Sequence, residues 1–234
     1  LEVALHIKLK DYYNELGLEL FNQINGKPKL VREVEPSLYA TRLMHMAQQY
    51  NLSISLSSTI NQVIDKLWLD YPEQLLIFFP TPYRADVEQF AAQNVLDPDL
   101  VWGLSRQESS FRASVESPVG AIGLMQLMPA TAQDMARAQG IKTSGISERL
   151  RQPELNLQLG SFYLAKLGKR YENKWPRAIA AYNAGEYVVD TWMARRDSPD
   201  MTIWAEGLSF GETSSYVKNV WRNWEVYRWL RKQR

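Results

Sequence analysis

Apolar residues recur every three or four positions along most of the chain, which is the period of an α-helix. In the first 25 residues they stand at 5, 9, 12, 13, 16, 20, 21 and 24. Proline marks several of the helix starts, because its ring fits the first turn of a helix and breaks the interior. The sequence therefore predicts an all-α (mostly helical) protein, with helices over 1–25, 37–50, 86–94, 98–110, 176–183, 186–196 and 213–231 and others starting near 60, 129 and 153.

Two prolines within four residues, Pro80 and Pro82, interrupt this pattern. Such a segment cannot continue a helix. A chain of 234 residues fits one medium domain, or one domain with a helical extension. We therefore predict a boundary here, between a helical scaffold over 1–80 and a second domain over 81–234.

Two stretches lack the helical period and are predicted to be irregular. The first runs from 111 to 128 and contains Gly120 and Gly123 beside a proline, and the second runs from 197 to 210. Glycine and proline at this density favour loops. The hydroxyl residues at 57–59 are predicted to lie just before the third helix, because such residues cap helix starts.

The charge balance bears on the class of partner. The chain has 27 Lys and Arg against 26 Asp and Glu, a formal charge of +1. A nucleic-acid-binding domain normally carries a clear basic excess, so no nucleic acid partner is predicted. The basic run between 218 and 234 is interpreted as the solvated side of the last helix, with a binding patch as the alternative. No stretch approaches the ~18 apolar residues of a membrane span.

The residues that usually hold metals or form nucleophilic triads are scarce. The chain has no cysteine, and its two histidines, His6 and His45, lie far from the motifs described below. Disulfides, thiol catalysis and Cys-ligated zinc are excluded, and we expect a site with neither metal nor cofactor. The chain starts at Leu1 and not at a methionine, so we expect a mature or excised piece.

One acid, Glu108, falls on the apolar stripe of the predicted helix over 98–110. Its neighbours at helical spacing are Val101, Leu104 and Phe111. Burial of a carboxyl group disfavours its charged form and raises its pKa. An acid that keeps its proton near neutral pH can protonate a leaving oxygen. From position alone, a buried structural glutamate is the equal alternative.

Further polar residues follow where a substrate could approach. Ser117 offers a hydroxyl, although a serine before proline is often only a turn residue. Gln126 can donate to and accept from sugar amides, and the ring of Tyr182 suits a sugar face. Met128 alternatively fills the core. Asn183 alternatively caps a helix end.

The combination of these residues is more specific than any one of them. Gln-Glu-Ser stands at 107–109, Gly-Leu-Met-Gln at 123–126 and Ala-Tyr-Asn-Ala-Gly at 181–185. This set resembles the lytic transglycosylases of bacterial cell walls, in particular the soluble Slt type, from about residue 81 to about 224. The resemblance implies a lysozyme-like catalytic domain over 81–234, with 1–80 as the linker part of a larger helical superstructure.

The resemblance also implies roles for single residues. Glu108 matches the family's sole catalytic acid. Binding-groove positions are matched by Ser117, Gln126, Met128, Tyr182, Asn183 and Glu212. The implied reaction is non-hydrolytic cleavage of the β-1,4 bond between N-acetylmuramic acid and N-acetylglucosamine, which leaves a 1,6-anhydromuramic acid end. No cofactor is implied, the partner is the peptidoglycan strand, the location is the periplasm, and cell-envelope proteins are further candidate partners.

Three other interpretations stay open at this point. A goose-type lysozyme-like hydrolase shares the fold and the acid but needs a second carboxylate, for which Glu116, Glu186 and Glu212 are candidates. A non-catalytic glycan-binding or assembly module would have no use for a poised acid. Residues 1–80 could in addition form a protein-interaction scaffold.

Overall fold

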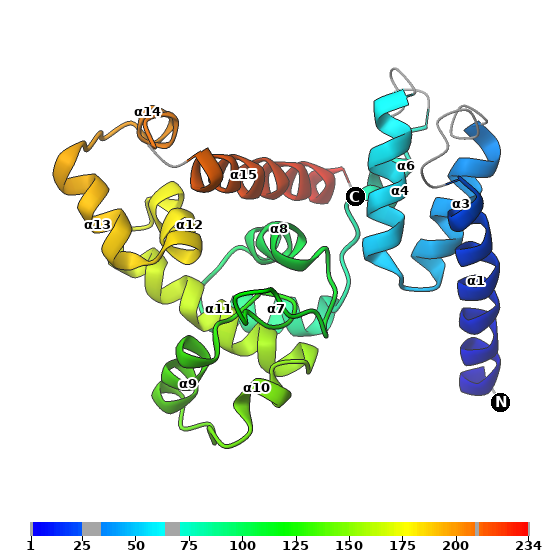
Figure 1. Cartoon of the computed structure of the whole chain (residues 1–234), viewed down its shortest axis with the longest axis horizontal. Coiled ribbons are helices and arrows are strands. Elements are labelled where there is room, and N and C mark those ends of the chain that lie inside the picture. Colours follow the sequence, from blue (N-terminus) through cyan, green and yellow to red (C-terminus); the bar gives the residue numbers. More distant parts are fainter. Residues whose placement is uncertain (1, 25–33, 64–70, 209–210, 234) are drawn as a thin grey trace. The chain divides into compact units, whose positions relative to one another are not determined.

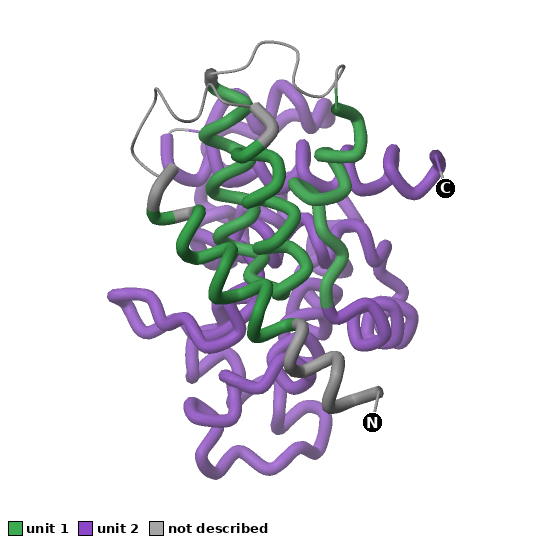
Figure 2. Tube along the Cα trace, turned by 90° about the vertical axis from the view of Figure 1, so that its right-hand side faces the viewer, with its two compact units in different colours: residues 1–82 green, residues 83–234 purple. Residues whose placement is uncertain are grey.

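The computed structural model describes residues 2–24, 34–63, 71–208 and 211–233. Within these ranges the regular elements are helices, and two isolated β-bridges join Glu116 to Ile122 and Ile122 to Leu127. The predicted all-α class is confirmed. The chain forms two compact units, residues 1–82 and 83–234, and each is described below by itself (Figure 1, Figure 2). The assignment of 1–80 as scaffold and 81–234 as catalytic domain stays a prediction.

The first unit consists of α1 (Glu2–Ile24), α3 (Val34–Met46), α4 (Tyr50–Val63) and α6 (Gln74–Phe78). The helix α3 packs against both α1 and α4. Buried apolar side chains of α3 and α4 form the core between them: Leu38, Ala40, Leu56 and Ile60. A buried hydrogen bond from Thr41 Oγ1 to Gln74 Oε1 (3.1 Å) ties α6 to α3, so the four helices form one packed unit.

The third helix of this unit begins earlier than the sequence predicted. It starts at Tyr50, so the hydroxyl residues at 57–59 lie inside it and not before it. Within a helix, Ser and Thr hydroxyls can bond back to a carbonyl one turn earlier, as Thr59 Oγ1 does to the Ser55 carbonyl (3.1 Å). The predicted end of the first helix, at residue 25, lies outside the described residues.

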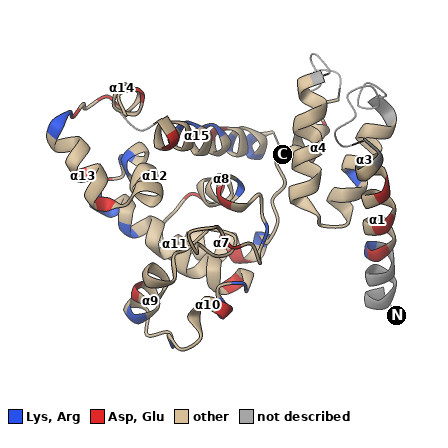
Figure 3. Ribbon diagram, viewed as in Figure 1, with Lys and Arg blue, Asp and Glu red and all other residues tan. Residues whose placement is uncertain are grey.

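The second unit begins with α7 (Arg84–Gln93) and α8 (Pro98–Ser109) and ends with α15 (Gly211–Lys232). Between them lie α9 (Pro129–Ala138), α10 (Ile146–Arg149), α11 (Pro153–Arg170), α12 (Trp175–Ala184), α13 (Glu186–Arg195) and α14 (Met201–Glu206). The helix α15 packs along α8 and also contacts α12. The helix starts predicted at Pro129 and Pro153 are confirmed. Basic and acidic residues are interspersed over the helices of this unit (Figure 3).

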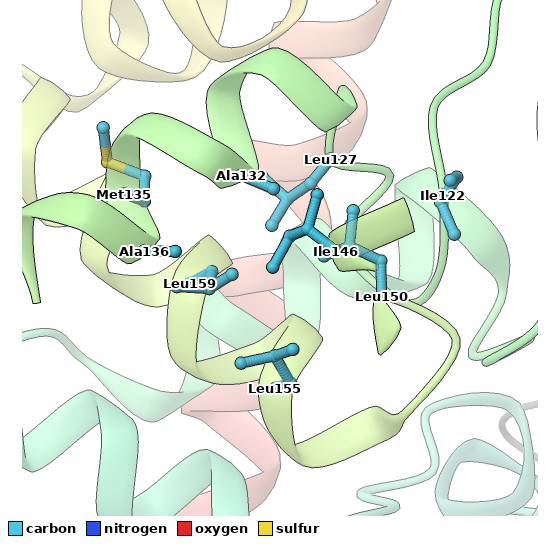
Figure 4. Packing of buried hydrophobic residues seen from close by; sticks show 9 residues of the cluster. All are labelled: Ile122, Leu127, Ala132, Met135, Ala136, Ile146, Leu150, Leu155 and Leu159. Atoms are coloured by element: carbon cyan, nitrogen blue, oxygen red, sulfur yellow. The ribbon is translucent and has the colours of Figure 1, made fainter. Parts of the chain in front are cut away.

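A cluster of buried apolar side chains fixes the loop over 111–128 against α9, α10 and α11 (Figure 4). Its members are Ile122, Leu127, Ala132, Met135, Ala136, Ile146, Leu150, Leu155 and Leu159. Full burial of one such aliphatic side chain stabilises a fold by roughly 1.5–3 kcal/mol. The loop, correctly predicted to lack a helix, is therefore held in place by its own apolar residues.

The helix α8 carries the candidate acid and contacts both α7 and α15. Asp97 caps its start and accepts a hydrogen bond from the Asp99 backbone N–H (3.1 Å). Trp224 Nε1 of α15 donates to Asp97 (3.0 Å). A Cβ added at Gly103 would lie 2.9 Å from the Trp224 backbone nitrogen. A glycine at this position therefore allows the two helices to approach closely.

The stretch over 197–210 was predicted to be irregular, and this was wrong for α14. Asp200 starts this short helix by accepting hydrogen bonds from the backbone N–H groups of Thr202 (2.8 Å) and Ile203 (3.2 Å). A helix of six residues is too short to display a helical period in the sequence.

The basic residues near the chain end are partly engaged in ion pairs. Lys218 Nζ lies 2.7 Å from Glu206, and Arg231 lies 2.9 Å from Asp97. Exposed pairs of this kind contribute little stability each. They favour the interpretation of the basic run as a solvated helix side. None of the described helices is both long and apolar enough to cross a membrane.

Candidate active site

Glu108 lies in the last turn of α8. Its predicted stripe neighbours Val101, Leu104 and Phe111 are all buried. Glu108 itself stays partly exposed. The carboxyl group is therefore lined by apolar side chains on its inner side and still accessible from outside.

The described contacts give the Glu108 carboxyl group a neutral hydrogen-bond partner and no counter-ion. The Tyr216 hydroxyl donates to Glu108 Oε1. Loss of solvation raises the pKa of Glu108 to about 7, while the hydrogen bond from Tyr216 acts more weakly in the opposite direction. Such a carboxyl group exchanges its proton near neutral pH, so it can serve first as an acid and then as a base.

Tyr216 lies within the last predicted helix and was not assigned to the site. It is buried. Its hydroxyl nevertheless reaches Glu108 across the contact between α8 and α15. Burial and the nearby Glu108 raise the pKa of Tyr216 well above its ordinary value, so the phenol remains a donor. Glu212, which was predicted to lie in the binding groove, stands four residues earlier on the same helix, and this was the available signal.

Tyr182 of α12 is electrostatically coupled to the same acid. Its hydroxyl donates to the Met125 carbonyl (2.8 Å), and its ring lies 5.2 Å from the ring of Tyr163. Burial, and next the charge of Glu108, raise the pKa of Tyr182 well above its ordinary value. Two neutral phenols from α12 and α15 therefore accompany the acid. Tyr163 was not assigned to the site from the sequence.

The loop over 111–128 packs on the end of α8. The Ser109 hydroxyl donates to the Leu124 carbonyl (2.8 Å). Gln126 has a left-handed φ of 46°, and its Nε2 donates to the carbonyls of Gly123 (2.9 Å) and Val115 (3.3 Å). Gln126 therefore braces the loop in addition to any contact that its amide makes with a substrate.

Asn156 of α11 fixes the same loop and was not identified from the sequence. Its buried side chain accepts from the Met125 N–H (2.8 Å) and donates to the carbonyls of Ile122 (2.8 Å) and Leu150 (2.9 Å). Gly123 is required beside it, because its φ is +84° and a Cβ there would lie 2.3 Å from Asn156 Nδ2. A single asparagine within a helix gives no sequence signal for such a role.

Ser117 forms a turn. Its Oγ accepts from the Ala121 N–H (2.9 Å), and its own N–H donates to the Ala121 carbonyl (2.8 Å). Gly120 continues this turn with a φ of 85°. The hydroxyl therefore has the local role that was the alternative for this serine, and its contact with a substrate stays a prediction.

Three more predicted binding residues lie on other elements. Met128 is the N-cap of α9, and 43% of its surface is exposed. Asn183 of α12 is exposed and accepts from the Thr213 hydroxyl (2.9 Å), which joins α12 to α15. Glu212 is exposed in the first turn of α15. All three are accessible to a ligand, and none is joined to Glu108 by a described hydrogen bond.

The candidates for a second carboxylate differ from Glu108 in their surroundings. Glu116 lies 2.7 Å from Arg151, and Glu186 lies 3.9 Å from Lys166. Each of these two carboxylates therefore has a cation nearby, whereas the described contacts of Glu108 include none. Within the described ranges, no cluster of three or more His, Asp or Glu side chains is arranged to hold a metal ion.

Residues 87–204, half of the chain, match the family model described as the Transglycosylase SLT domain. The chain belongs to this family. The match contains Glu108, the loop after it and α12, and it ends before α15, which carries Glu212 and Tyr216. The resemblance inferred from the motifs is confirmed.

Curated relatives of this SLT-domain chain are full proteins of greater length. The soluble lytic murein transglycosylase of Escherichia coli (strain K12) is 33% identical over 72% of this chain, which spans 26% of that protein. The protein of the same name from Salmonella typhimurium (strain LT2) is 33% identical over 82% of this chain, which spans 29% of it.

Solved structures similar to the SLT-domain chain give the same result. An inactive mutant of the lytic transglycosylase Slt from Pseudomonas aeruginosa matches with a TM-score of 0.73 and 27% identity, over 94% of this chain and 36% of that one. A complex of the 70-kDa soluble lytic transglycosylase with bulgecin A matches with a TM-score of 0.73 and 30% identity, over 83% of this chain and 30% of that one. The predicted lysozyme-like fold is confirmed.

Proposed function

We propose that this SLT-domain chain cleaves the glycan strands of peptidoglycan without water, with Glu108 as its only acid and base. The main support is a carboxyl group with a pKa of about 7 and a neutral hydrogen-bond partner, placed on a helix of the SLT domain. At neutral pH such a group is protonated in about half of the molecules. The similar proteins, named lytic murein transglycosylases, support the same substrate.

The reaction begins with transfer of the Glu108 proton to the oxygen that links N-acetylmuramic acid to N-acetylglucosamine. The bond between this oxygen and C1 of the muramic acid breaks, and the N-acetylglucosamine leaves with a free 4-hydroxyl. The oxygen of the substrate's own acetamido group stabilises the positive charge that develops at C1, as in substrate-assisted glycosidases. A second protein carboxylate is therefore not required.

The second step uses the carboxylate that the first step leaves. Glu108 accepts the proton of the muramic C6 hydroxyl, and the C6 oxygen forms a bond to C1. The product carries a 1,6-anhydro ring, Glu108 regains its proton, and no water is consumed. An attack from within the same molecule has a large entropic advantage over the capture of water. The environment that raises the pKa of Glu108 also makes its carboxylate a stronger base.

Residues around Glu108 are proposed to hold the muramic ring in the shape that closure requires. Tyr216 orients one carboxyl oxygen of Glu108. Contacts with the glycan are proposed for Ser117, Gln126, Met128, Tyr182, Asn183 and Glu212.

We further propose that residues 81–234 carry out the catalysis and that residues 1–80 support them. The murein substrate implies a periplasmic location, where cell-envelope proteins are further candidate partners.

Mass spectrometry of the fragments released from purified peptidoglycan tests this proposal. We expect 1,6-anhydromuramic acid ends, which are lighter than hydrolysed ends by one water. The Glu108→Gln variant is the control and should release no fragments while keeping its fold. Hydrolysed ends would instead indicate a goose-type lysozyme, and release by Glu108→Gln would remove the assignment of the acid.

A further inference from the structure

A pocket apart from Glu108 lies between the end of α13 and α14 and has a volume of about 150 Å³. Indole rings and aliphatic side chains form its apolar wall: Trp192, Ile203, Trp204 and Leu208. Arg195 and Arg196 also line it, and the end of α13 is correspondingly basic (Figure 3). A cavity of about this volume can accept a benzene-sized group, so it can hold one small residue of a ligand.

A buried arginine lies behind this pocket. Arg177 of α12 is only 4% exposed, and its guanidinium lies 5.8 Å from the centre of the Trp204 ring. It donates to the Asp197 carboxylate and to the Ser198 carbonyl (3.0 Å), and both of these residues line the pocket. Its Nε finds no hydrogen-bond partner among the described residues.

The charges around the pocket favour an anion. Asp197 balances Arg177, which leaves the guanidinium groups of Arg195 and Arg196 as a positive excess. A guanidinium group binds a carboxylate through two parallel hydrogen bonds. The matching ligand is a carboxylate on a small apolar body, such as the last residue of a short peptide.

The pocket is connected to the acid through the start of α15. Ser214 donates to the Ala205 carbonyl of α14 (3.3 Å), and Tyr216 of the same helix donates to Glu108. Two residues of helix correspond to about 3 Å of rise. The helix α14, which forms one wall of the pocket, and Glu108 therefore both contact residues near the start of α15.

We propose that this pocket binds the C-terminal carboxylate of a peptide stem on the glycan strand. This inference rests on the proposed function, because peptidoglycan is the glycan that carries such stems. Arg195 and Arg196 hold the carboxylate, and the indole and aliphatic walls receive the side chain of the last residue. The pocket thereby selects strands whose stems end in a free carboxylate.

Binding measured by calorimetry tests the proposal in the Glu108→Gln background, where the strand is not cleaved. Three glycan fragments of equal length are compared: one with free stem carboxylates, one with amidated stem ends and one without stems. The Arg195→Gln/Arg196→Gln variant should bind the first fragment about tenfold more weakly, as expected for loss of a charge-assisted contact, and the other two unchanged. The Lys142→Gln/Lys169→Gln variant removes two exposed charges elsewhere and should bind all three like its parent.

Equal weakening for all three fragments, or no weakening for the first, would overturn the proposal. The amidated fragment gives a test without any substitution at the pocket. It should bind the unaltered pocket about tenfold more weakly than the free acid, and equal affinity contradicts the proposal. If free acetate competed for the pocket as well as the stem does, the pocket would be a nonspecific anion site, and the proposal would be overturned. If the protein without substitutions released no anhydro products from peptidoglycan, the proposed function would be overturned. The binding comparison above would be unaffected.

Discussion

The two ends of α8 place carboxyl groups in opposite electrostatic settings. At its start, Asp97 and Asp99 lie at the positive end of the helix dipole, and Arg231 lies 2.9 Å and 2.8 Å from them. At its end, Glu108 lies at the negative end of the dipole and is bonded to the neutral Tyr216 hydroxyl. One helix therefore places carboxylates beside a cation at one end and an acid beside a neutral phenol at the other. The paired acids support the fold, and the acid without a counter-ion is suited to chemistry.

Removing the transferable proton of Glu108, at the C-terminal end of α8, should have the largest effect on activity. Glu108→Gln keeps the shape of the side chain but cannot transfer a proton, so the rate of peptidoglycan clearing should fall by about 10³-fold. Asp99→Asn at the other end should clear peptidoglycan close to the normal rate at a temperature where both variants are folded. Turbidity measurements compare the two, and similar losses would abolish the distinction between the ends.

Glu108→Gln should also change how the stability of the chain depends on pH. The pKa of Glu108 is about 7 in the folded chain and 4.5 ordinarily, so between these pH values the unfolded chain releases a proton that the folded chain keeps. Stability therefore falls as pH rises through this window, by about 3 kcal/mol in total. Glu108→Gln removes this loss and should be the more stable protein at pH 8 but not at pH 4.5, by urea unfolding. If the stability of the unaltered chain and of Glu108→Gln depended on pH in the same way, Glu108 would be ionised like a surface residue.

The loop that packs on the C-terminal end of α8 should be sensitive to a single methyl group. Gly123→Ala adds a Cβ 2.3 Å from Asn156 Nδ2 at a positive φ and should destabilise the chain by about 2 kcal/mol or more. Gly120→Ala is the matched control, because its φ is also positive (+85°) but no atom lies within 4 Å of the added Cβ. It should cost about 1 kcal/mol by the same unfolding assay. Equal costs would mean that the Asn156 contact is unimportant.

Breaking the ion pair at the N-terminal end should have a moderate effect. Asp99 is 2% exposed and Arg231 is half-exposed, so Asp99→Asn should destabilise the chain by about 1–2 kcal/mol at neutral pH. Glu225→Gln breaks the more exposed pair with Arg228 and should cost less than about 0.5 kcal/mol. Thermal unfolding measures both. A stabilised Asp99→Asn variant would mean that this end, too, disfavours charge.

The smallest expected effect comes from Tyr216→Phe. The Tyr216 hydroxyl lowers the pKa of Glu108, so its removal should raise that pKa further. Cleavage requires the protonated acid and declines as pH rises through its pKa. The declining limb of the pH profile should therefore move to higher pH in this variant. A shift to lower pH would mean that Tyr216 stabilises the protonated acid instead.

The sequence predicted local features of the site and not its long-range contacts. Glu108 could be identified because apolar residues recur around it with the helical period. Tyr216 and Asn156 could not, since their bonds to Glu108 and Met125 join residues 108 and 31 positions apart. The hydroxyl residues at 57–59 were misread because the same side chains can cap a helix or bond back within it. Helix starts marked by proline were predicted well, since the constraint lies in the residue itself.

The most direct test of this account is a titration of the Glu108 carboxyl carbon by NMR, identified by the signal that disappears in Glu108→Gln. We expect a midpoint near pH 7, coinciding with the pH at which cleavage declines. A midpoint near the ordinary value of 4.5 would show that Glu108 is ionised at neutral pH, and it would contradict a reaction that starts from its proton.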